Sequence, residues 1–499
     1  MPFLNRLAAW AQESPQRQAV RVGRESLSWE ELRAGAAALL DRVPDGGYSL
    51  LQEPNSLDFI LRWVAGVSGS RRCVVLDAGL PDDLAARIRA EVAAHWGAAD
   101  ALSARTVRGL TAAPDGPSRE TVVEHHAAPR GGELADGPSG TPFLLALTSG
   151  TATLPKAIVR TRESWQASFV SSTEVFGLTR DEVTLAPGPL SSGLGLYALS
   201  ECLHAGGEFR TLEAFDVDAV HDAVEHDGVT RLVLVPSMLR VLAEGGMLAG
   251  SDASSLRSIV VAGAKLDPRT LEAARRWAPA ARIHEYYGAQ ELSFVSGSCL
   301  APDDPLTDRL LASTSVGRPF PGVSLAILDP SGAPLPDGHT GSIAVRSAMV
   351  GEGYLWGDAK DFERFGEWAT VHDQGFLHEG ELHFLGRASD MIESGGLVLH
   401  PQEIERALST LPGVEFALVA GVDDPLRGER LVAAVRTEHR GIGEGQLRMG
   451  LADLLDPRML PEAFHELREV PLTARGKVSR AVLREWILDG DPRVPRLPV

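Results

Sequence analysis

Lysine is rare in this chain and stands in two places where it could do chemistry. It occurs only at Lys156, Lys265, Lys360 and Lys477, whereas the other 44 of the 48 basic residues are arginine. Because a compact ammonium and a flat guanidinium bind different groups, each lysine is a candidate for a specific contact. Chance retention is the alternative explanation for any single lysine.

Lys156 and Lys477 both follow segments rich in glycine and threonine. The first ends the run Leu-Thr-Ser-Gly-Thr-Ala-Thr-Leu-Pro-Lys at 147–156, and the second follows Thr-Ala-Arg-Gly at 473–476. The hydroxyls and backbone amides of such a loop, together with an ammonium, can converge on phosphate. The sequence therefore predicts a phosphate-binding loop at 147–156.

The composition is that of a globular protein with more than one domain. The chain has 499 residues, 44% of them hydrophobic and 23% charged, and a single core stops growing at roughly 250–300 residues. Cys73, Cys202 and Cys299 form no C-x-x-C pair, which argues against a disulfide framework or a zinc site. The net charge of −19 argues against broad contact with nucleic acid or an anionic membrane.

No targeting or membrane-spanning segment is predicted. The N-terminus begins Met-Pro-Phe-Leu-Asn-Arg and lacks the basic start and apolar core of a signal peptide. No stretch approaches the ~18 consecutive apolar residues of a transmembrane helix. The fourteen histidines form no cluster with the spacing of metal ligands. With the scattered cysteines, these features lead us to expect a cytoplasmic protein.

Short apolar runs alternate with helical periodicity over the middle of the chain, which favours an α/β fold. We predict strands at 143–147, 233–236, 258–263 and 283–288, helices at 217–226 and 266–277, and a β-rich region from Val323 with turns at 329–332 and 336–338. Ligands in open α/β sheets bind beyond the carboxyl ends of the strands. Residues 147–156, 262–266 and 286–291 are therefore expected to line one crevice.

Five motifs occur in the order found in one enzyme superfamily. They are the loop at 148–156, the Tyr-Gly-Ala-Gln-Glu turn at 287–291, residues 368–375, the segment 386–405 and the tail at 471–480. With them the chain resembles an AMP-forming acyl-CoA synthetase of the adenylate-forming superfamily, which includes amino-acid adenylation domains and beetle luciferases. The resemblance covers nearly the whole length and is weakest toward the N-terminus.

The resemblance implies both an architecture and a reaction. The architecture is a large N-terminal domain at 1–386 made of α/β subdomains and a β-rich part, a hinge at 387–390, and a small mobile α+β domain at 391–499. In the reaction a carboxylate attacks the α-phosphorus of ATP and expels pyrophosphate, and a thiol then displaces AMP from the acyl-adenylate. Because both reactants of the first step are anions, cations and hydrogen-bond donors must offset their repulsion.

The resemblance also implies a set of nucleotide-binding residues. Thr148, Ser149, Gly150, Thr151 and Lys156 would hold the β- and γ-phosphates, and Glu291 would bind Mg²⁺, which bridges phosphate oxygens. The adenine and ribose would be bound by a larger set, namely Gly263, Ala264, Lys265, Glu285, Tyr286, Tyr287, Gly288, Ala289, Gln290, Asp373 and Arg387. In that set Tyr287 would stack on the base and Asp373 would accept from the ribose hydroxyls. A turn-capping aspartate at 373 and a surface carboxylate at a helix start at 291 are the structural alternatives.

By the same resemblance, Lys477 would bridge the substrate carboxylate and the α-phosphate, so the predicted catalytic residues are Lys477, Glu291 and Lys156. The small domain would then rotate about the hinge residues Ser389 and Asp390 for the thiol step. Gly395 and Gly396 would line the thiol tunnel, or else form a plain turn.

Several positions depart from the family pattern. The phosphate loop has Ala152 and Thr153 where the family usually has threonine and glycine, and Gln290 replaces the hydroxyl residue before Glu291. The hinge position, usually aspartate or lysine, is Ser389. Because an amide still donates hydrogen bonds, we interpret Gln290 as tuning the site. A non-catalytic nucleotide-binding homologue is the alternative that these departures leave open.

The acid pocket is predicted to be lined by small and apolar residues, which do not distinguish a fatty acid from an alicyclic or aromatic one. Its expected residues are Ser192, Leu194, Leu196, Tyr197, Ala264 and Ala289, joined by Phe294. No His or Asp stands at 187–197 to pair a charged substrate group, so the pocket indicates an uncharged organic acid. Asp216 resembles part of an amino-acid signature but is better explained as a helix N-cap, and Gly193-Leu-Gly195 lacks the third glycine of a dinucleotide motif.

The acceptor is inferred from the tail of the chain. No carrier domain follows Arg480, so the acyl group is expected to leave on coenzyme A. Transfer to a free-standing acyl carrier protein in a natural-product pathway is the alternative, and oxidative luciferase-like chemistry is excluded only weakly. The predicted cofactors and cosubstrates are ATP, Mg²⁺ and coenzyme A, and a homodimer is possible.

Overall fold

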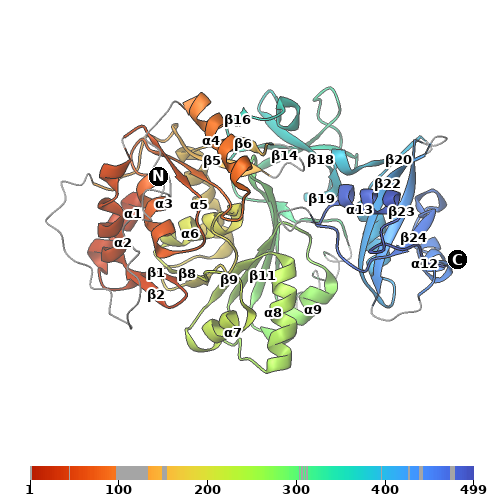
Figure 1. Cartoon of the computed structure of the whole chain (residues 1–499), viewed down its shortest axis with the longest axis horizontal. Helices are drawn as coiled ribbons and strands as arrows, with labels where there is room; N and C mark the ends of the chain where they lie inside the picture. Colours follow the sequence, from red (N-terminus) through yellow and green to blue (C-terminus); the bar gives the residue numbers. More distant parts are fainter. Residues whose placement is uncertain are drawn as a thin grey trace. The chain divides into compact units, whose positions relative to one another are not determined.

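The computed structural model describes residues 3–43, 45–96, 133–148, 154–302, 304, 307, 310, 313–394, 396–424, 428–437, 442–472 and 478–498 (Figure 1). The chain divides into two compact units. The first unit comprises Met1–Ala326, Ala344–Val371 and Gly380–Leu382, and the second comprises Ile327–Ile343, His372–Glu379 and His383–Val499. Each unit is described in turn.

A nine-stranded sheet forms the centre of the first unit. Its strands, in spatial order, are β13 (Arg318–Pro319), β12 (Ser293–Leu300), β11 (Arg282–Ala289), β10 (Ser258–Ala262), β9 (Arg231–Leu234), β7 (Val183–Leu185), β8 (Glu208–Thr211), β1 (Gln18–Val22) and β2 (Glu25–Ser28). The strands from β11 to β1 pair in parallel, and β13, β12 and β2 add antiparallel edges. A parallel sheet with helices on its faces confirms the predicted α/β class.

Strand alternation gives the nine-stranded sheet two different faces. Alternate residues Leu232, Leu234, Ile259, Val261 and Ile283 join one core with α7 (Val217–His226), α8 (Pro236–Ala249) and α9 (Pro268–Trp277). The residues between them face the opposite side, where α5 (Arg162–Phe176) and α6 (Gly193–Ala205) lie. Successive side chains of a strand point to opposite faces, so each strand serves both layers. Figure 1 shows α7, α8 and α9 together on one side of this sheet.

A second sheet of five strands completes the first unit. It has the order β16 (Gly353–Trp356), β6 (Lys156–Thr161), β5 (Pro142–Thr148), β4 (Arg72–Val75) and β3 (Tyr48–Leu51). One face packs against α4 (Asp82–Trp96). On the other, Trp63 of α3 (Leu57–Gly66), Phe143 of β5 and Trp165 of α5 form an aromatic cluster. Helices α1 (Leu4–Glu13) and α2 (Trp29–Ala37) lie near the N-terminus.

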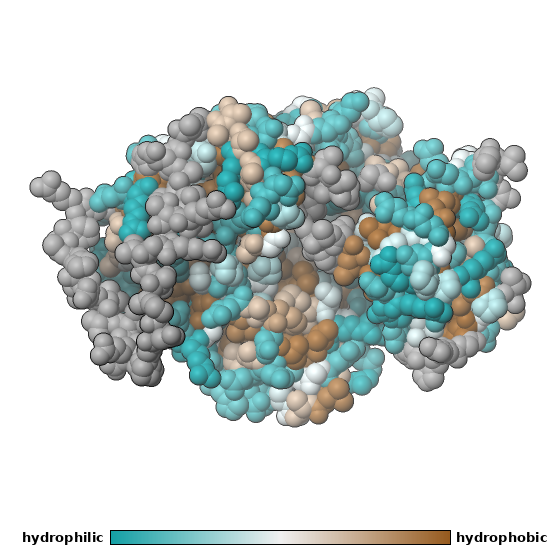
Figure 2. Space-filling model, viewed as in Figure 1, coloured by the Kyte–Doolittle hydropathy of each residue, from teal (hydrophilic) through white to brown (hydrophobic). Residues whose placement is uncertain are grey.

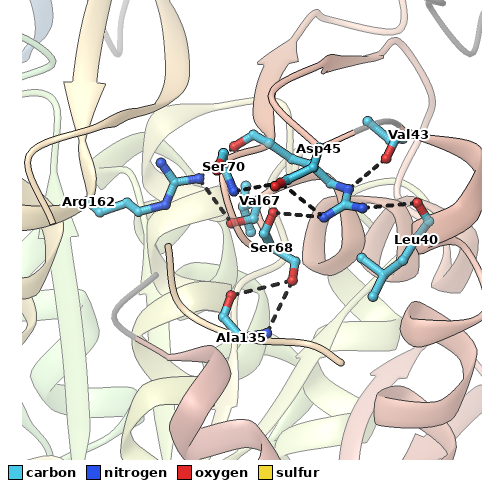
Figure 3. Close-up of polar contacts among 9 residues, drawn as sticks. Leu40, Val43, Asp45, Val67, Ser68, Ser70, Ala135 and Arg162 are labelled. Carbon is cyan, nitrogen blue, oxygen red and sulfur yellow. Dashed lines mark hydrogen bonds and ion pairs between the residues drawn. The ribbon is translucent and has the colours of Figure 1, made fainter. Parts of the chain in front are cut away.

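Two arginines fix the loops around β4 and β5. Arg71 donates to the carbonyl oxygens of Val43, Leu40 and Ser68 at 2.7, 3.2 and 3.4 Å, and lies 3.6 Å from Asp45. Arg162, fully buried at the start of α5, donates to the carbonyl oxygens of Arg71 at 2.6 Å and Val67 at 3.4 Å (Figure 3). Burial lowers the pKa of Arg162 to about 10. These bonds satisfy loop carbonyls that would otherwise be buried without partners.

A third sheet is formed by strands between residues 324 and 387. Its order is β14 (Ser324–Leu328), β15 (Gly341–Arg346), β18 (Trp368–His378) and β17 (Glu363–Phe365), with β19 (Glu381–Arg387) also paired to β18. The predicted turns at 329–332 and 336–338 connect β14 to β15 and carry glycines with φ of +85° at Gly332 and +79° at Gly338. Such angles favour glycine because it lacks a Cβ. The β-rich region predicted from Val323 is therefore confirmed.

The second unit contains a sheet covered by helices on both faces. Its order is β21 (Leu397–Leu399), β20 (Ile392–Ser394), β23 (Gly428–Thr437) and β22 (Val414–Asp424), with β24 (Ala463–Glu466) parallel to β23. On one face β22 and β23 pack against α11 (Pro401–Ser409) and α12 (Glu444–Ala452), and on the other against α13 (Arg480–Asp489). Short 3₁₀ helices occur at Leu40–Arg42, Ala359–Asp361, Ala388–Asp390 and Pro457–Met459.

Most predicted elements match the structure to within one residue at each end, and the helix at 266–277 and the strand at 233–236 differ by two residues. The helix at 217–226 is α7, and Asp216 caps it by accepting from the Ala219 amide at 2.8 Å, as predicted. The helix predicted at 266–277 begins at Pro268, because Asp267 is its N-cap. The strand predicted at 233–236 is β9, which ends at Leu234, because Pro236 begins α8.

The described part of the chain contains no helix that is both long and apolar enough to cross a bilayer. Figure 2 shows a mixed surface on the visible face of the first unit, with hydrophobic side chains gathered near α7 and α8. Val241, Met247 and Leu248 of α8 are exposed there.

His284 on β11 makes the first unit sensitive to acid. Its ring is buried and meets the edge of Phe176 at 5.4 Å. Burial, reinforced by the positive charges of Arg231 and Arg282, lowers the pKa of His284 to about 4. The unfolded chain, with an ordinary histidine pKa, therefore binds the proton more tightly, so this site loses stability as the pH falls below about 6.5.

We predict that His284→Phe reduces the acid sensitivity of folding. Between pH 7.5 and pH 5 the variant should lose about 2 kcal/mol less unfolding free energy than the unmodified protein, because the titrating imidazole is gone. Urea titrations followed by tryptophan fluorescence at both pH values measure this difference. The control His226→Phe alters an exposed histidine of α7 and should behave like the unmodified protein. An identical pH dependence for all three proteins would contradict the assignment.

Candidate functional site

Tyr354 lies between Lys156, predicted to bind phosphate, and Glu291, predicted to bind Mg²⁺. Its hydroxyl donates to Glu291 Oε1 at 2.7 Å, and Lys156 Nζ lies 5.9 Å from the centre of its ring. Lys156 is the first residue of β6, which pairs with β16, the strand that carries Tyr354. Lys156 also forms an ion pair of 2.6 Å with Asp361. Strand pairing thus brings Lys156 and Glu291, one residue from each motif, to one place.

A buried arginine fixes the turn that carries Glu291. Arg160 of β6 is 2% exposed and donates to the carbonyl oxygens of Gln290 at 2.9 Å, Glu291 at 3.3 Å and Met349 at 2.6 Å. Burial lowers the pKa of Arg160 to about 10, and Tyr197 and Glu291 partly oppose this shift. The Gly351 amide donates to the Glu291 carbonyl at 2.8 Å. The backbone at Glu291 is therefore held from two segments far away in sequence.

Lys265 and Glu285 form a clamp at the carboxyl end of β10. Lys265 Nζ donates to Glu285 Oε2 at 2.8 Å and to the Ser315 carbonyl at 2.6 Å. The other oxygen of Glu285 accepts from the Leu266 amide. Both residues belong to the predicted nucleoside set, and in the structure they support the loop that begins at Gly263, whose φ is +94°.

The residues of the 285–290 turn are divided between the two faces of β11. Glu285 points toward Lys265, whereas the ring of Tyr286 packs 4.7 Å from that of Phe294 on the opposite face. Tyr287 follows on the side of Glu285 by strand alternation. The sequence grouped Tyr286 with the nucleoside-binding residues, but the structure places it beside an apolar cavity.

This cavity runs along α6 on the face of the sheet opposite α8 and α9. Ten residues line it, namely Phe176, Leu194, Tyr197, Ala198, Glu201, Arg231, Val233, Val260, Tyr286 and Phe294. The four from α6 are spaced i, i+3, i+4 and i+7, which places them on one helical face. At the start of this helix Gly193 touches Gln290, since a Cβ there would lie 1.8 Å from Gln290 Nε2. The cavity-lining face of α6 therefore begins beside the Glu291 turn.

The predicted acid pocket overlaps this cavity in part. Leu194, Tyr197 and Phe294 line it, whereas Leu196, Ala264 and Ala289 do not. Ser192 instead caps α6 by accepting from the Gly195 amide at 3.1 Å. The acid-pocket prediction missed the other seven lining residues, namely Phe176, Ala198, Glu201, Arg231, Val233, Val260 and Tyr286, the last of which was assigned to the nucleoside. Continuing the helical spacing from Leu194 and Tyr197 would have found Ala198 and Glu201.

In the second unit, the predicted ribose and hinge residues lie in two charged groups. Asp373 is 5% exposed, and Arg387 Nε lies 3.7 Å from its Oδ1. Arg480 binds both oxygens of Glu405 at 2.7 and 2.9 Å and Asp390 Oδ2 at 3.3 Å. Burial raises the pKa of Glu405 against the effect of Arg480. Arg480 therefore ties the hinge carboxylate to the start of α13.

Some predicted site residues lie outside the described part of the structure. They are Ser149, Gly150, Thr151, Ala152, Thr153, Gly395 and Lys477, together with the side chains of Thr148 and Ser389. Gly396 is described and has φ of +80°. The roles predicted for these residues stay predictions.

The chain matches two family models. Residues 7–355 match the AMP-binding enzyme model, and residues 403–477 match the AMP-binding enzyme C-terminal domain model. The resemblance predicted from the motifs is confirmed by these matches.

Curated relatives of similar length are acyl-CoA ligases. An uncharacterised acyl-CoA ligase of Bacillus subtilis is 32% identical over 350 residues, which cover 69% of each chain. The indoleacetate–CoA ligase of Aromatoleum aromaticum is 32% identical over 398 residues, covering 78% of this chain and 76% of that protein.

Solved structures share the fold over almost the whole chain. The amide bond synthetase of Marinactinospora thermotolerans has a TM-score of 0.81 and 29% identity over 96% of this chain and 99% of its own. The o-succinylbenzoate CoA synthetase of Bacillus subtilis, solved with an acyl-adenylate intermediate, has a TM-score of 0.78 at 22% identity, covering 96% of this chain and 97% of its own.

We predict that Arg160→Met destabilises the first unit. Three backbone carbonyls would lose a buried donor, which should lower the free energy of unfolding by about 3 kcal/mol. Urea titration of the variant tests this value. Arg87→Met is the matched control, because Arg87 is an exposed residue of α4 and its loss should change stability by less than about 0.5 kcal/mol. Equal stability of the two variants would show that Arg160 does not support the turn.

Proposed function

The chain belongs to the AMP-binding enzyme family, and from this premise we propose that it activates a carboxylic acid with ATP and transfers the acyl group to coenzyme A. The observation that carries the proposal is the position of Tyr354 between Lys156 and Glu291. Tyr354 thus connects Lys156, a cation suited to bind phosphate, with Glu291, a carboxylate suited to bind a metal ion. Gln290, next to Glu291, lies against Gly193 at the start of α6, and we propose that the acid binds along this helix.

The proposed reaction has two displacements. A carboxylate oxygen forms a bond to the α-phosphorus of ATP, and the bond to pyrophosphate breaks. The thiol of coenzyme A, losing its proton, then attacks the acyl carbon, and AMP leaves. In the first step Lys156 would exchange its contact with Asp361 for the phosphates and so offset the repulsion between the two anions.

Glu291 fits a magnesium site. Its carboxylate is buried and uses Oε1 to accept from Tyr354, which orients the remaining lone pairs. Mg²⁺ in nucleotide enzymes is characteristically bound by one or two carboxylates plus substrate phosphates. When bound, this ion would draw negative charge from the phosphate oxygens.

The second unit would supply the remaining groups. We propose that Asp373 accepts hydrogen bonds from the ribose hydroxyls, with Arg387 beside it. Lys477 would bridge the carboxylate and the α-phosphate, and residues 391–499 would turn about the hinge at 387–390 between the two steps. Arg480 would support this arrangement, because it joins Asp390 to the helix that follows Lys477.

The proposed acceptor of the acyl group is inferred from the similar proteins. Those named acyl-CoA ligases favour coenzyme A, and a separate carrier protein uses the same thiol chemistry. The structural similarity to an amide bond synthetase at 29% identity favours an amine as a second candidate acceptor, because an amine nitrogen can attack the same acyl-adenylate.

The test is a pyrophosphate-release assay with ATP, Mg²⁺ and a panel of carboxylic acids. It is run with coenzyme A, with amines and with neither, and products are identified by mass spectrometry. Acid-dependent release with acyl-CoA formation supports the proposal, and amide formation identifies the second candidate. Silence across the panel would contradict adenylation itself.

We predict that Tyr354→Phe weakens the use of Mg²⁺. Loss of the hydroxyl that orients Glu291 should raise the Mg²⁺ concentration for half-maximal pyrophosphate release about tenfold, since partners of metal ligands contribute factors of this size. Tyr48→Phe, on β3 at the other edge of the same sheet, is the control. An unchanged Mg²⁺ dependence in both variants would argue against Glu291 as the ligand.

We also predict that Lys477→Ala separates the two half-reactions. Adenylate formation should fall by at least a hundredfold, because a charge-offsetting donor is lost, while thiolysis of a supplied acyl-adenylate continues. Pyrophosphate release and acyl-CoA formation are measured separately. Equal loss of both would refute the alternation of the small domain.

A further inference from the structure

A buried asparagine joins the second sheet to the nine-stranded sheet at the carboxyl ends of their strands. Asn55 lies between the end of β3 and the start of α3, and it is 6% exposed. Its side chain reaches residues that follow β7 and residues at the end of β8. Ligands of open α/β sheets bind beyond the carboxyl ends of the strands. A residue that fixes the loops at this edge can therefore position a substrate.

Asn55 uses both halves of its amide group. Its Nδ2 donates to the Leu212 carbonyl at 2.8 Å, and to the Gly188 carbonyl and Thr211 Oγ1 at 3.0 Å each. Its Oδ1 accepts from the Leu190 amide at 2.7 Å. Aspartate of the same size has no N–H to donate when ionised, and leucine can neither donate nor accept. The position therefore requires asparagine for both kinds of bond.

The loop that Asn55 holds leads directly into α6. Leu190, which it binds through the backbone, is fully buried. Ser192, the N-cap of α6, donates to the Pro189 carbonyl from its amide at 3.0 Å and from its hydroxyl at 2.7 Å. Gly195 in the first turn of α6 packs on the same carbonyl, since a Cβ there would lie 2.5 Å from its oxygen. The start of α6 is therefore fixed by the loop at 188–190.

The turn that carries Glu291 contacts the start of α6 but has supports of its own. Gly193 lies against the side chain of Gln290. Arg160 donates to the carbonyl oxygens of Gln290 and Glu291, and Tyr354 donates to the Glu291 carboxylate. None of these bonds involves Asn55. Loss of Asn55 would therefore release α6 while the turn proposed to bind the nucleotide and Mg²⁺ keeps its place.

We propose that Asn55 is a positioning residue for the carboxylic acid. It sets the place of the start of α6 relative to the turn at 290–291, and it acts through the loop at 188–190 without touching either substrate. The inference rests on the proposed adenylation and on the proposed binding of the acid along α6. It deepens both, because it assigns to one residue the alignment of the acid with ATP.

Asn55→Ala tests the proposal in the pyrophosphate-release assay with the full chain. The acids are acetate, hexanoate, palmitate, benzoate, phenylacetate, cinnamate and indole-3-acetate, and the acid with the highest kcat/KM is used. We expect the KM for this acid to rise about tenfold or more, because a misplacement of ~1 Å costs up to about a hundredfold in reactivity. The KM for ATP should change less than about twofold. A merely structural role would lower the amount of folded enzyme and leave both KM values unchanged.

Thr211→Val is the second, milder variant. It keeps the shape of the side chain and removes the hydroxyl that accepts from Asn55 and donates to the Ala186 carbonyl at 2.7 Å. The KM for the acid should rise about threefold, since one bond of the network is lost. This variant decides the question if urea titration shows that Asn55→Ala does not fold.

Thr230→Val is the matched control. Thr230 is also buried, and its hydroxyl accepts from the Val183 amide at 3.0 Å. It ties β7 to β9 at their amino ends, away from the proposed site. Urea titration should show a loss of stability, as in Thr211→Val, whereas the KM for the acid should stay within about twofold of that of the unmodified protein.

The outcomes separate this inference from the proposed function. An acid KM that is unchanged in Asn55→Ala and Thr211→Val, or that changes together with the KM for ATP, would overturn the inference and leave adenylation intact. An equal rise of the acid KM in Thr230→Val would overturn it as well, because any loss of stability would then have the same effect. Absence of pyrophosphate release from the unmodified protein with every acid would instead overturn the proposed function, and this inference with it.

Discussion

The hydrogen bonds of Arg160 hold together the three segments on which the candidate site depends. From β6 this side chain reaches the carbonyls of Gln290, Glu291 and Met349. It therefore fixes the turn after β11 and the approach to β16 relative to the strand that begins with Lys156. Without a shared donor, these carbonyls would need separate partners in a region with little access to water. The short contact between Tyr354 and Glu291 follows from this arrangement, since β16 and the turn are held by the same strand.

A second constraint is the alternation of side chains along β9, β10 and β11. Leu232, Ile259 and Ile283 pack under the outer helices, whereas Val233, Val260 and Tyr286 face α6. Continuing along β11, Glu285 leaves the outer core to clamp Lys265, while its neighbour Tyr286 lines the cavity. One peptide unit thus separates the side proposed for the nucleoside from the side proposed for the acid. In the proposed reaction, β11 would therefore contribute side chains to both substrate sites.

Local sequence patterns predicted the helices and strands whose formation depends on neighbouring residues. The helix α7 follows from its apolar periodicity. Its cap at Asp216 follows because the aspartate side chain accepts a hydrogen bond from one of the first N–H groups of the helix, which have no partner within it. The strands β10 and β11 follow from buried apolar runs. The partners of the site residues could not be predicted in this way. Tyr354 reaches Glu291 across 63 positions of sequence, and Asp361 reaches Lys156 through the folding of a different segment. Such contacts depend on strand order in the sheet, which spacing along the chain does not specify.

The ion pair of Glu201 and Arg231 could not be predicted from local sequence patterns either, and its burial costs free energy. The two residues are separated by 30 positions, and the residues predicted for the pocket gave no sign that its floor is charged. A buried ion pair is a weak source of stability, because removing two charges from water offsets most of their attraction, and apolar residues of similar volume often serve as well or better. Among the described residues the pair is also incompletely hydrogen-bonded, which lowers its contribution to stability further. Packing alone therefore gives no reason for these two residues at the end of an otherwise apolar cavity.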